Sequence, residues 1–395
     1  MTNKKSFAIG LLAGIVLMFV VSTIYSGRMY YSRWGGGLSP SVKVEEIYRL
    51  VSRYSIMPFD REEMIENMYR GLLAGVGDPY TTYFCEDSLE ELLSRTAGTF
   101  VGIGVRVVMD PEDRMLTLVR VFPDAPASLV GLLPGDKIVT VDGHDVVGYV
   151  QQDIVHMILG EAGTTVTLGV FRPSENQRFD VDIVRAQVVV PSVAHEMIES
   201  DGRRTGYIRI EGFEEPTYRQ FAAALEELTA GGMDSLIIDL RYNGGGLLHS
   251  VVQISNRLIP EGIITYVEDV DGRRRYHYSS AEYIGLPLVV LINGGSASAS
   301  EVLAGAVQDT GVGSLVGEQS FGKGIVQNIL NLSDGTAIRL TIAKYFTPNG
   351  ISIHGVGLTP DFVVEMDREY SRRIDELPHE EDVQLQIALR MVHRK

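Results

Sequence analysis

Residues 286–327 contain side chains that could carry out nucleophilic catalysis. An apolar run ends in Asn293-Gly-Gly and is followed at 296–301 by Ser-Ala-Ser-Ala-Ser-Glu. Further on, Lys323 stands in Phe-Gly-Lys-Gly. The pattern predicts a buried strand, a glycine turn, a helix start and a second glycine loop. Such an arrangement presents a hydroxyl and an amine to each other at one edge of a sheet.

Ser298 and Lys323 are the pair that this stretch offers for chemistry. A serine in the first turn of a helix lies at the positive end of the helix dipole, which favours a developing negative charge. A lysine is a useful base when burial lowers its pKa toward neutrality. Phe321, Ile325 and Val326 would provide apolar surroundings for the amine.

The serines also have a purely structural explanation. Ser296, Ser298 and Ser300 could simply begin a helix, with Ser296 as its N-cap. For any one of them taken alone, capping is the better interpretation.

Three familiar motifs do not fit the sequence. No serine has glycines two residues before and two residues after it, so the nucleophile elbow of α/β-hydrolases is absent. No His-Glu-x-x-His occurs and the 8 histidines are scattered, which argues against a zinc peptidase. Residues 317–323 match the start of a P-loop, but Gly324 stands where a Ser or Thr must bind magnesium. We interpret that match as coincidental.

The elements that would position the pair follow an α/β pattern. From about Val188, strand-like and helix-like segments alternate, at 206–210, 217–229, 235–240, 248–258 and 288–292. Continuous apolar strands alternating with helices indicate a largely parallel sheet covered on both faces. Ligands of such sheets bind outside the carboxyl ends of the strands, where the Asn-Gly-Gly turns at 243–245 and 293–295 are expected.

Composition limits the class of protein. Of 395 residues, 45% are apolar and 22% charged, as in globular chains of two or three domains. The net charge of −16 argues against a nucleic-acid partner, because binding phosphates requires a basic face. Cys85 is the only cysteine, so no intramolecular disulfide can form, and we expect Cys85 to be a small packing residue.

The N-terminal region has the properties of a membrane segment. Lys4 and Lys5 precede an uncharged run at 7–25, which is long enough to span a bilayer as a helix. We interpret it as an uncleaved single-pass anchor rather than a signal sequence, although cleavage after Ser22 or Ser26 stays open. In either case the rest of the chain is exported, to the periplasm or otherwise outside the cytoplasmic membrane.

Two amphipathic helices are predicted before the first strands. Residues 44–54 have one apolar helical face, and Asp60 with Glu63 forms a capping box for a second helix that ends near Gly75. Two helices cannot bury their own apolar faces. Together with a last amphipathic helix around 383–391, they favour a homodimer.

Residues 96–186 resemble a PDZ domain of the circularly permuted bacterial type. The resemblance rests on Gly102-Ile103-Gly104-Val105 and on a second signature that runs from Ala125-Pro-Ala to Asp136-Lys-Ile. It implies that residues 102–105 bind the terminal carboxylate of a peptide. A glycine-flanked turn can expose backbone N–H groups for this purpose, while the adjacent strand edge pairs with the peptide. The alternative, that the glycines only permit a β-bulge, would be favoured without the second signature.

The chain as a whole is similar to the carboxyl-terminal processing peptidases, the tail-specific Ser/Lys proteases of family S41. The similarity covers about residues 44 to 364. It rests on the serine segment at 296–301, Phe-Gly-Lys-Gly at 321–324, Asp-Leu-Arg-Tyr-Asn-Gly-Gly-Gly at 239–246 and Asp-Pro-Tyr-Thr at 78–81. It implies an α/β fold, with a crotonase-like ααβ protease core, an inserted PDZ domain, and N-terminal and C-terminal helical segments.

The same similarity implies a role for each site residue. The nucleophile, the base, the amide that orients the base and the oxyanion donors would be Ser298, Lys323, Gln327, and the N–H of Ala299 with that of Gly244 or Gly245. On an extended segment Gln327 returns to the strand face of Lys323, so a hydrogen bond to the amine is reasonable. No metal or organic cofactor is needed, and the substrates would be proteins or peptides held by their C-termini.

These expectations divide the chain into six regions. They are an anchor or signal sequence at 1–27, a linker at 28–40, a helical region at 41–95, the PDZ domain at 96–186, the protease core at 187–366 and a C-terminal helix at 367–395. Two other functions stay open at this point: an inactive scaffold that binds tails without cleaving them, and a crotonase-like acyl-CoA enzyme. The natural substrates and any regulatory adaptor are not indicated by the sequence.

Overall fold

The computed structural model describes residues 39–200, 202–280, 282–367, 370 and 377–393, together with 15, 17, 18 and 20–22. They fall into two compact units, Met1–Tyr69 and Arg70–Lys395. Most of the predicted membrane segment at 7–25 and of the linker at 28–40 lies outside the described residues. Among the residues that are described, no helix has both the length and the apolar character needed to cross a bilayer.

The first unit is built on α2 (Pro40–Tyr54), and α3 (Arg61–Ala74) begins within it. The predicted cap of α3 is confirmed, because Asp60 Oδ1 accepts hydrogen bonds from the N–H groups of Glu62 and Glu63 at 2.7 and 3.1 Å. No residue of either helix is buried. Between them lies a groove of about 320 Å³ lined mainly by apolar side chains, among them Val44, Ile47, Met64, Ile65 and Met68.

A β-rich domain occupies residues 99–189 of the second unit. Its sheet consists of β3 (Val105–Met109), β4 (Leu116–Val121), β5 (Lys137–Val141), β6 (His144–Asp145), β7 (Thr165–Arg172) and β8 (Gln177–Val184). The strands enclose a separate hydrophobic core together with α5 (Pro126–Leu129) and α6 (Gln151–Ile158). β2 (Thr99–Gly102) and β9 (Ala186–Val189) pair with each other where the chain enters and leaves the domain.

Residues 100–108 do not form one continuous strand but are divided between β2 and β3. The interruption falls at Ile103-Gly104, where Gly104 has a φ of 80° that a strand cannot contain. The carbonyl groups of Ile103 and Gly104 accept hydrogen bonds from Ala127 and Phe122. The break therefore forms a fixed turn rather than a bulge within one strand.

Another six-stranded sheet of the second unit has the order β10 (Val193–Ser200), β11 (Arg203–Ile210), β12 (Ser235–Asp239), β15 (Leu288–Ile292), β16 (Gly313–Gly317) and β19 (Phe362–Val363). β10 is antiparallel to β11, and all other neighbours are parallel. Every residue of β12 and β15 is buried, as expected of strands covered on both faces. The predicted α/β class is confirmed.

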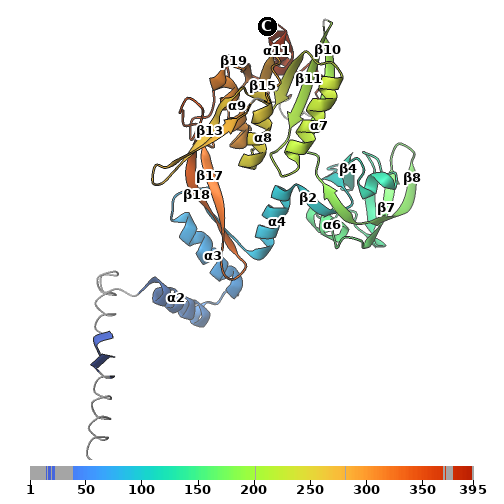
Figure 1. Cartoon of the computed structure of the whole chain (residues 1–395). Helices are drawn as coiled ribbons and strands as arrows, with labels where there is room; N and C mark the ends of the chain where they lie inside the picture. Colours follow the sequence, from blue (N-terminus) through green and yellow to red (C-terminus); the bar gives the residue numbers. More distant parts are fainter. Residues whose placement is uncertain are drawn as a thin grey trace, which may run out of the picture. The chain divides into compact units, whose positions relative to one another are not determined.

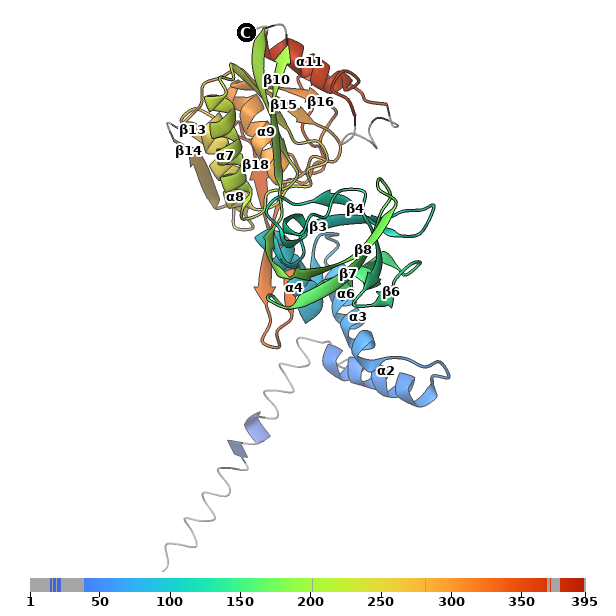
Figure 2. The same cartoon turned by 90° about the vertical axis from the view of Figure 1, so that its right-hand side faces the viewer.

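Helices cover both faces of this sheet (Figures 1 and 2). α7 (Thr217–Ala230), α8 (Leu248–Leu258) and α9 (Ala299–Thr310) share one hydrophobic core with one set of strand side chains. α11 (Val383–Val392) packs on the alternate side chains, which point to the opposite face.

A second, antiparallel sheet brings distant segments of the chain together. It contains β1 (Thr82–Phe84), β18 (Ala337–Phe346), β13 (Gly262–Asp269) and β14 (Arg274–Ser279) in that order, and β17 (Ile325–Asn331) also pairs with β18. Because β1 pairs with β18, the segment just before β1 lies beside the strand that follows Lys323. α4 (Glu86–Ala97) then leads from β1 to the β-rich domain.

We expect Gly104→Ala to destabilise the β-rich domain more than Gly131→Ala does. Both glycines have a φ near 80°, so the backbone strain of the two substitutions is comparable. A methyl group on Gly104 would meet Ala125 Cβ at 2.2 Å, whereas nothing lies within 4 Å of the same position on Gly131. The additional loss should be about 1–3 kcal/mol of unfolding free energy. Hydrogen exchange of the strand peptides in increasing denaturant measures it, and equal losses for the two variants would contradict the packing explanation.

Candidate active site

Ser298 is the serine of its segment that faces solvent. Ser296 Oγ donates to the carbonyl of Leu240 at 2.8 Å, and Ser300 Oγ donates to the carbonyl of Asn243 at 2.8 Å. Both side chains are buried and tie the turn to the loop that follows β12. The expected N-cap at Ser296 is wrong, since Ser298 is the N-cap of α9.

The backbone of Ser298 is held in an unusual conformation. Its φ is 56° and its ψ is −113°, values that a residue with a Cβ adopts at a cost of about 1–3 kcal/mol. Its side chain is only partly buried. Strain of this kind persists where surrounding contacts impose it, and it is frequent at sites of chemistry.

Four of the predicted site residues border one cleft of about 390 Å³, and Gly245 and Ala299 are not part of its lining. Ser298, Lys323 and Gln327 line it, and Gly244 and Gly246 of the loop after β12 form another part of its wall. The remaining wall is largely apolar, with contributions from Phe213, Leu247, Ile325, Ile329 and Tyr345. The hydroxyl of Ser298, the amine of Lys323 and the backbone of Gly244 therefore border the same space.

A buried carboxylate joins the two halves of the candidate dyad. Glu301 Oε2 accepts from the backbone N–H of Ser298 and from that of Lys323, each at 2.8 Å. Its other oxygen, Oε1, accepts from Ser320 Oγ at 2.6 Å and from the N–H of Gly322 at 2.7 Å. Glu301 is fully buried, and these four donors satisfy its oxygens. The side chain of Glu301 thus fixes the turn that carries Ser298 and the loop that carries Lys323 relative to each other.

The surroundings of Lys323 favour an uncharged amine. Burial lowers its pKa, and the positive charge of Arg339 lowers it further, whereas the carboxylate of Asp78 acts in the opposite direction. The amine nitrogen lies 4.8 Å from the centroid of the Tyr80 ring, a contact that favours the charged form. Burial comes from the walls of the cleft.

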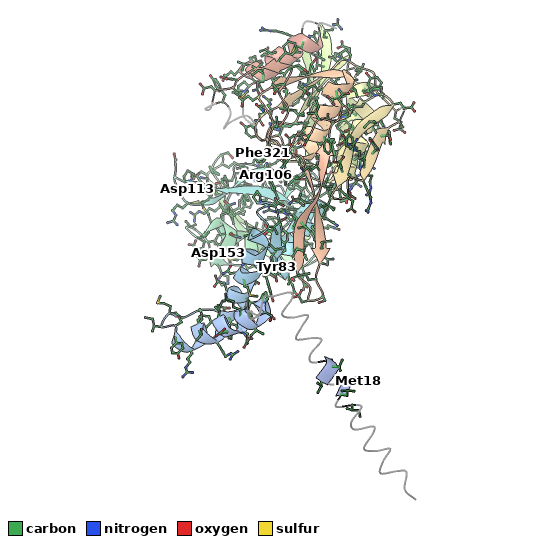
Figure 3. The ribbon with its side chains drawn as sticks, turned by 90° about the vertical axis from the view of Figure 1, so that its left-hand side faces the viewer. Met18, Tyr83, Arg106, Asp113, Asp153 and Phe321 are labelled. Carbon is green, nitrogen blue, oxygen red and sulfur yellow. The ribbon has the colours of Figure 1, made fainter. Side chains whose placement is uncertain are left out.

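The expectation that Phe321 helps to bury the amine is wrong. Its side chain is 56% exposed and is not part of the cleft wall (Figure 3). Ile325 and Val326, the other two residues predicted for this environment, do line the cleft.

Gln327 lies on the cleft wall but is held by a different partner. Its amide nitrogen donates to the carbonyl oxygen of Tyr80 at 2.8 Å, and Arg339 Nε donates to the same oxygen at 3.2 Å. Within the described part of the chain, no hydrogen bond joins the side chains of Gln327 and Lys323. The orienting contact therefore stays a prediction, and in this structure Tyr80 contacts both residues.

The loop after β12 packs directly against the nucleophile turn. A Cβ built on Gly245 would lie 2.8 Å from Ser298 Cβ and 3.0 Å from the nitrogen of Ala299, so no larger residue fits. The N–H of Gly245 donates to Asn243 Oδ1 at 2.8 Å. The N–H groups of Gly244 and Ala299 donate to no residue that the structure describes, which makes them the pair available to an oxyanion.

The P-loop interpretation is not supported by the structure. Residues 317–324 end β16 and run through a loop into β17, where a phosphate-binding loop requires a helix.

The turn predicted to bind a peptide carboxylate in the PDZ domain has a suitable form, since the N–H groups of Ile103 and Gly104 have no acceptor among the described residues. Gly102 and Val105 end β2 and begin β3 on either side of it.

Three residues of this site were missed from the sequence. Glu301 could have been found, because Ser298-x-x-Glu301 has the spacing of a capping box. Tyr80 reaches the base through the pairing of β1 with β18, which no local pattern indicates, and Arg339 through the pairing of β17 with β18.

Comparisons with known proteins agree with this geometry. Residues 204–364 match the model of peptidase family S41, and residues 101–183 match a PDZ domain. The chain is 34% identical over 334 residues to carboxy-terminal processing protease CtpB of Bacillus subtilis, covering 83% of this chain and 68% of that protein. It is 36% identical over 327 residues to a carboxy-terminal-processing protease of Bartonella bacilliformis, covering 80% and 73%.

A solved structure gives the same result. The photosystem II D1 C-terminal processing protease is 32% identical, covers 83% of this chain and 87% of its own, and superimposes with a TM-score of 0.50. The fold and the relatives define a serine protease with a PDZ domain. The chain belongs to the carboxy-terminal processing proteases of peptidase family S41.

We expect Glu301→Gln to lower kcat/KM by about 100-fold while the protein stays folded. A carboxamide offers one acceptor oxygen, so it leaves two of the four buried donors unpaired, at about 1–3 kcal/mol each. Glu318→Gln is a matched control, because that carboxylate accepts from one N–H group, of Met366, and a carboxamide can replace it. Peptide hydrolysis and circular dichroism measure the outcome. Equal activity of the two variants would show that the Glu301 contacts do not hold the site.

A separate prediction concerns pH. A lysine base acts in its neutral form, so with Lys323 as the predicted base kcat/KM should rise as pH increases through the pKa of its amine. Arg339→Gln removes a charge that lowers this pKa, so the acid limb of the profile should move to higher pH. Arg339→Lys keeps the charge and should leave the limb in place. A shift to lower pH, or the same shift in both variants, would contradict the electrostatic explanation.

Proposed function

We propose that this protein is a serine endopeptidase that cleaves exported proteins near their C-termini by a Ser298/Lys323 dyad. The observation that carries the proposal is the Glu301 carboxylate, which holds the backbone of both residues at the edge of one cleft. The family membership supports the class of reaction. The inactive scaffold is not favoured, because Ser298, Lys323 and Gln327 are all present.

The mechanism follows from these residues. Neutral Lys323 takes the proton from Ser298 Oγ, which attacks the carbonyl carbon of the scissile peptide. The oxyanion of the tetrahedral intermediate accepts from the N–H groups of Gly244 and Ala299. The C–N bond breaks as the Lys323 ammonium returns its proton to the leaving amine. Lys323 then activates a water molecule, which hydrolyses the acyl-enzyme.

In this mechanism Gln327 orients the base. Its amide nitrogen donates to the carbonyl of Tyr80, whose ring lies 4.8 Å from the Lys323 amine, and its amide oxygen would be the acceptor for that amine. Gly245 contributes through its lack of a side chain, which lets the loop after β12 approach Ser298.

The PDZ domain would recognise the substrate tail. The terminal carboxylate would accept from the turn at 102–105, and the tail would pair with the open edge of β3. Arg106 of β3, which Figure 3 labels, and Arg120 of β4 each contact Glu211 of the protease core at 3.2 Å. Glu211 is followed closely by Phe213, which exchanges backbone hydrogen bonds with Gly245 and Leu247. A contact path between the tail-binding strand and the oxyanion loop supports a role in delivering or gating the substrate.

Location and assembly are also part of the proposal. The uncharged run at 7–25 after Lys4 and Lys5 supports a single-pass anchor, with the protease outside the cytoplasmic membrane. The apolar groove between α2 and α3 supports a homodimer formed through this first unit. A regulatory adaptor could act on the same exported part.

We expect Ser298→Ala and Lys323→Ala each to lower the cleavage of a loosely folded, tailed substrate by at least about 1000-fold, because either change removes the nucleophilic step. Binding of a tail peptide to the PDZ domain should be unaffected in both variants. Cleavage assayed by gel electrophoresis and tail binding by calorimetry provide the two measurements.

The histidines supply matched controls. His249 pairs with Glu215 on the exposed surface and His354 is exposed, so His249→Ala and His354→Ala should retain activity. Normal cleavage by Ser298→Ala would refute the assignment of the nucleophile. Loss of cleavage in His354→Ala would indicate a histidine base in place of Lys323.

A further inference from the structure

The C-terminal helix α11 is attached to the protease core at both of its ends. Leu385, Ala388 and Leu389 are buried against β12, β15 and β16. Asp382 is the N-cap of the helix and accepts from the N–H of Leu385. At the other end, His393 contacts Thr205 Oγ1 at 2.8 Å.

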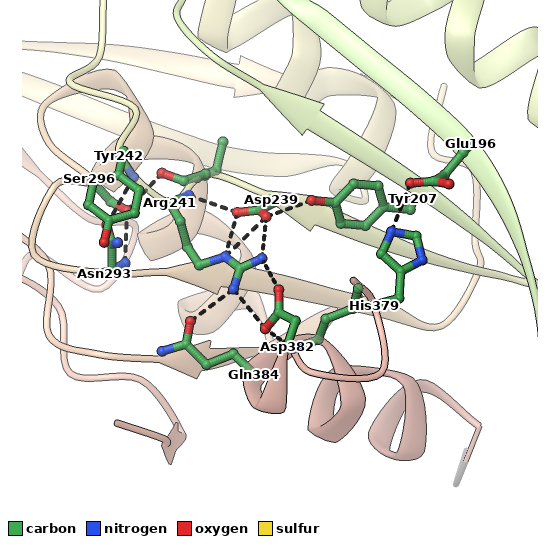
Figure 4. Close-up of polar contacts among 12 residues, drawn as sticks. Glu196, Tyr207, Asp239, Arg241, Tyr242, Asn293, Ser296, His379, Asp382 and Gln384 are labelled. Carbon is green, nitrogen blue, oxygen red and sulfur yellow. Dashed lines mark hydrogen bonds and ion pairs between the residues drawn. The ribbon is translucent and has the colours of Figure 1, made fainter. Parts of the chain in front are cut away.

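The N-terminal attachment is a buried ionic network (Figure 4). Arg241 Nη1 and Nη2 donate to the two oxygens of Asp382 at 3.0 and 2.8 Å, and Nη1 also donates to Gln384 Oε1 at 3.0 Å. The same guanidinium donates to Asp239 at 2.6 to 3.0 Å, and Tyr207 donates to Asp239 Oδ2 at 2.7 Å. Arg241 is 2% exposed and Asp382 is 4% exposed. Two carboxylates therefore hold one guanidinium in a single position.

Arg241 directly precedes the loop that carries the candidate oxyanion donor. Tyr242 has a φ of 61°, a strained value for a residue with a side chain, and its N–H donates to Asn293 Oδ1 at 2.9 Å. Asn243 accepts from the N–H of Ala297 and through its side chain from Gly245. The position of the Gly244 N–H thus depends on a strained backbone that begins at Arg241.

We propose that Asp382 is a positioning residue for the oxyanion loop, and that it acts through Arg241. The inference rests on the proposed role of the Gly244 N–H in the reaction. It makes the C-terminal helix part of the catalytic apparatus, although no residue of α11 lines the cleft.

The structure gives a physical reason for this dependence. A cavity of about 190 Å³ borders Arg241 and Asp382 and is lined by polar side chains that include Tyr207, Arg209 and His379. Without the Asp382 carboxylate, the guanidinium keeps Asp239 at the end of β12 and the amide oxygen of Gln384, but it loses its charged partner at the start of the helix. The arginine then has space to rotate into the cavity, and the strained loop after it can relax.

The test compares two changes to the same helix in the full chain. Asp382→Ala removes the carboxylate that holds Arg241, and Asp382→Asn keeps an acceptor oxygen without the charge. Leu389→Ala is the matched control, because it weakens the packing of α11 and leaves the ionic network untouched. Each variant is assayed for kcat and KM with a tailed peptide and for thermal stability. Each is also assayed for inhibition by a substrate-like peptide aldehyde, whose hemiacetal adduct with serine occupies the oxyanion hole.

We expect Asp382→Ala to lower kcat by about 10- to 100-fold with little change in KM, as for the loss of a contact made in the transition state. Aldehyde inhibition should weaken by a similar factor, and Asp382→Asn should fall between this variant and the parent. Leu389→Ala should lose thermal stability and keep its kcat.

Two results would overturn the inference. One is an unchanged kcat and aldehyde affinity in both Asp382 variants. The other is an equal loss of kcat in Leu389→Ala, which would show that only the docking of α11 matters. A failure of the proposed function is recognised separately, because Ser298→Ala would then cleave the peptide as well as the parent does.

Discussion

The site depends on one carboxylate in a place where water does not reach. Moving an unpaired carboxylate into a protein interior costs several kcal/mol, so Glu301 is tolerated only while its hydrogen-bond donors surround it. Three of the four donors are backbone N–H groups, of Ser298, Gly322 and Lys323, and they come from two separate loops. The contacts that satisfy the buried charge therefore also hold the backbone of Ser298 beside that of Lys323.

This arrangement explains the glycines of the site. Gly322 has a φ of 89°, and a Cβ on it would lie 2.9 Å from the nitrogen of Gly357. A Cβ on Gly324 would lie 2.5 Å from the nitrogen of His354. The loop of Gly322, Lys323 and Gly324 must pass close to a neighbouring backbone in order to turn its N–H groups toward Glu301. Only glycine permits that approach. Gly245 likewise lets the loop after β12 pass close to the backbone of the turn that carries Ser298.

Much of the fold follows from local patterns in the sequence, but the full site does not. The continuous apolar runs of β12 and β15 indicate buried parallel strands, and the Asn-Gly-Gly turns mark the edge at which the site lies. The strands β13 and β14 were missed, since β14 is rich in arginine and tyrosine and is largely exposed. The contact of Tyr80 with the base follows from the pairing of β1 with β18, two segments far apart in the sequence, and such pairing leaves no periodicity in either segment.

The roles of Ser296, Ser298 and Ser300 also could not be distinguished from the sequence alone. The three serines alternate along one segment, and their equal spacing suggests equal roles. In the structure Ser296 and Ser300 bind backbone carbonyls of the loop after β12, and Ser298 borders the cleft. The hydroxyl groups of Ser296 and Ser300 hold the loop after β12 against the turn that carries Ser298. Glu301 in turn holds this turn against the loop that carries Lys323. Because each of these contacts uses a buried polar group that would be costly to leave unpaired, loss of one weakens the alignment that the others maintain.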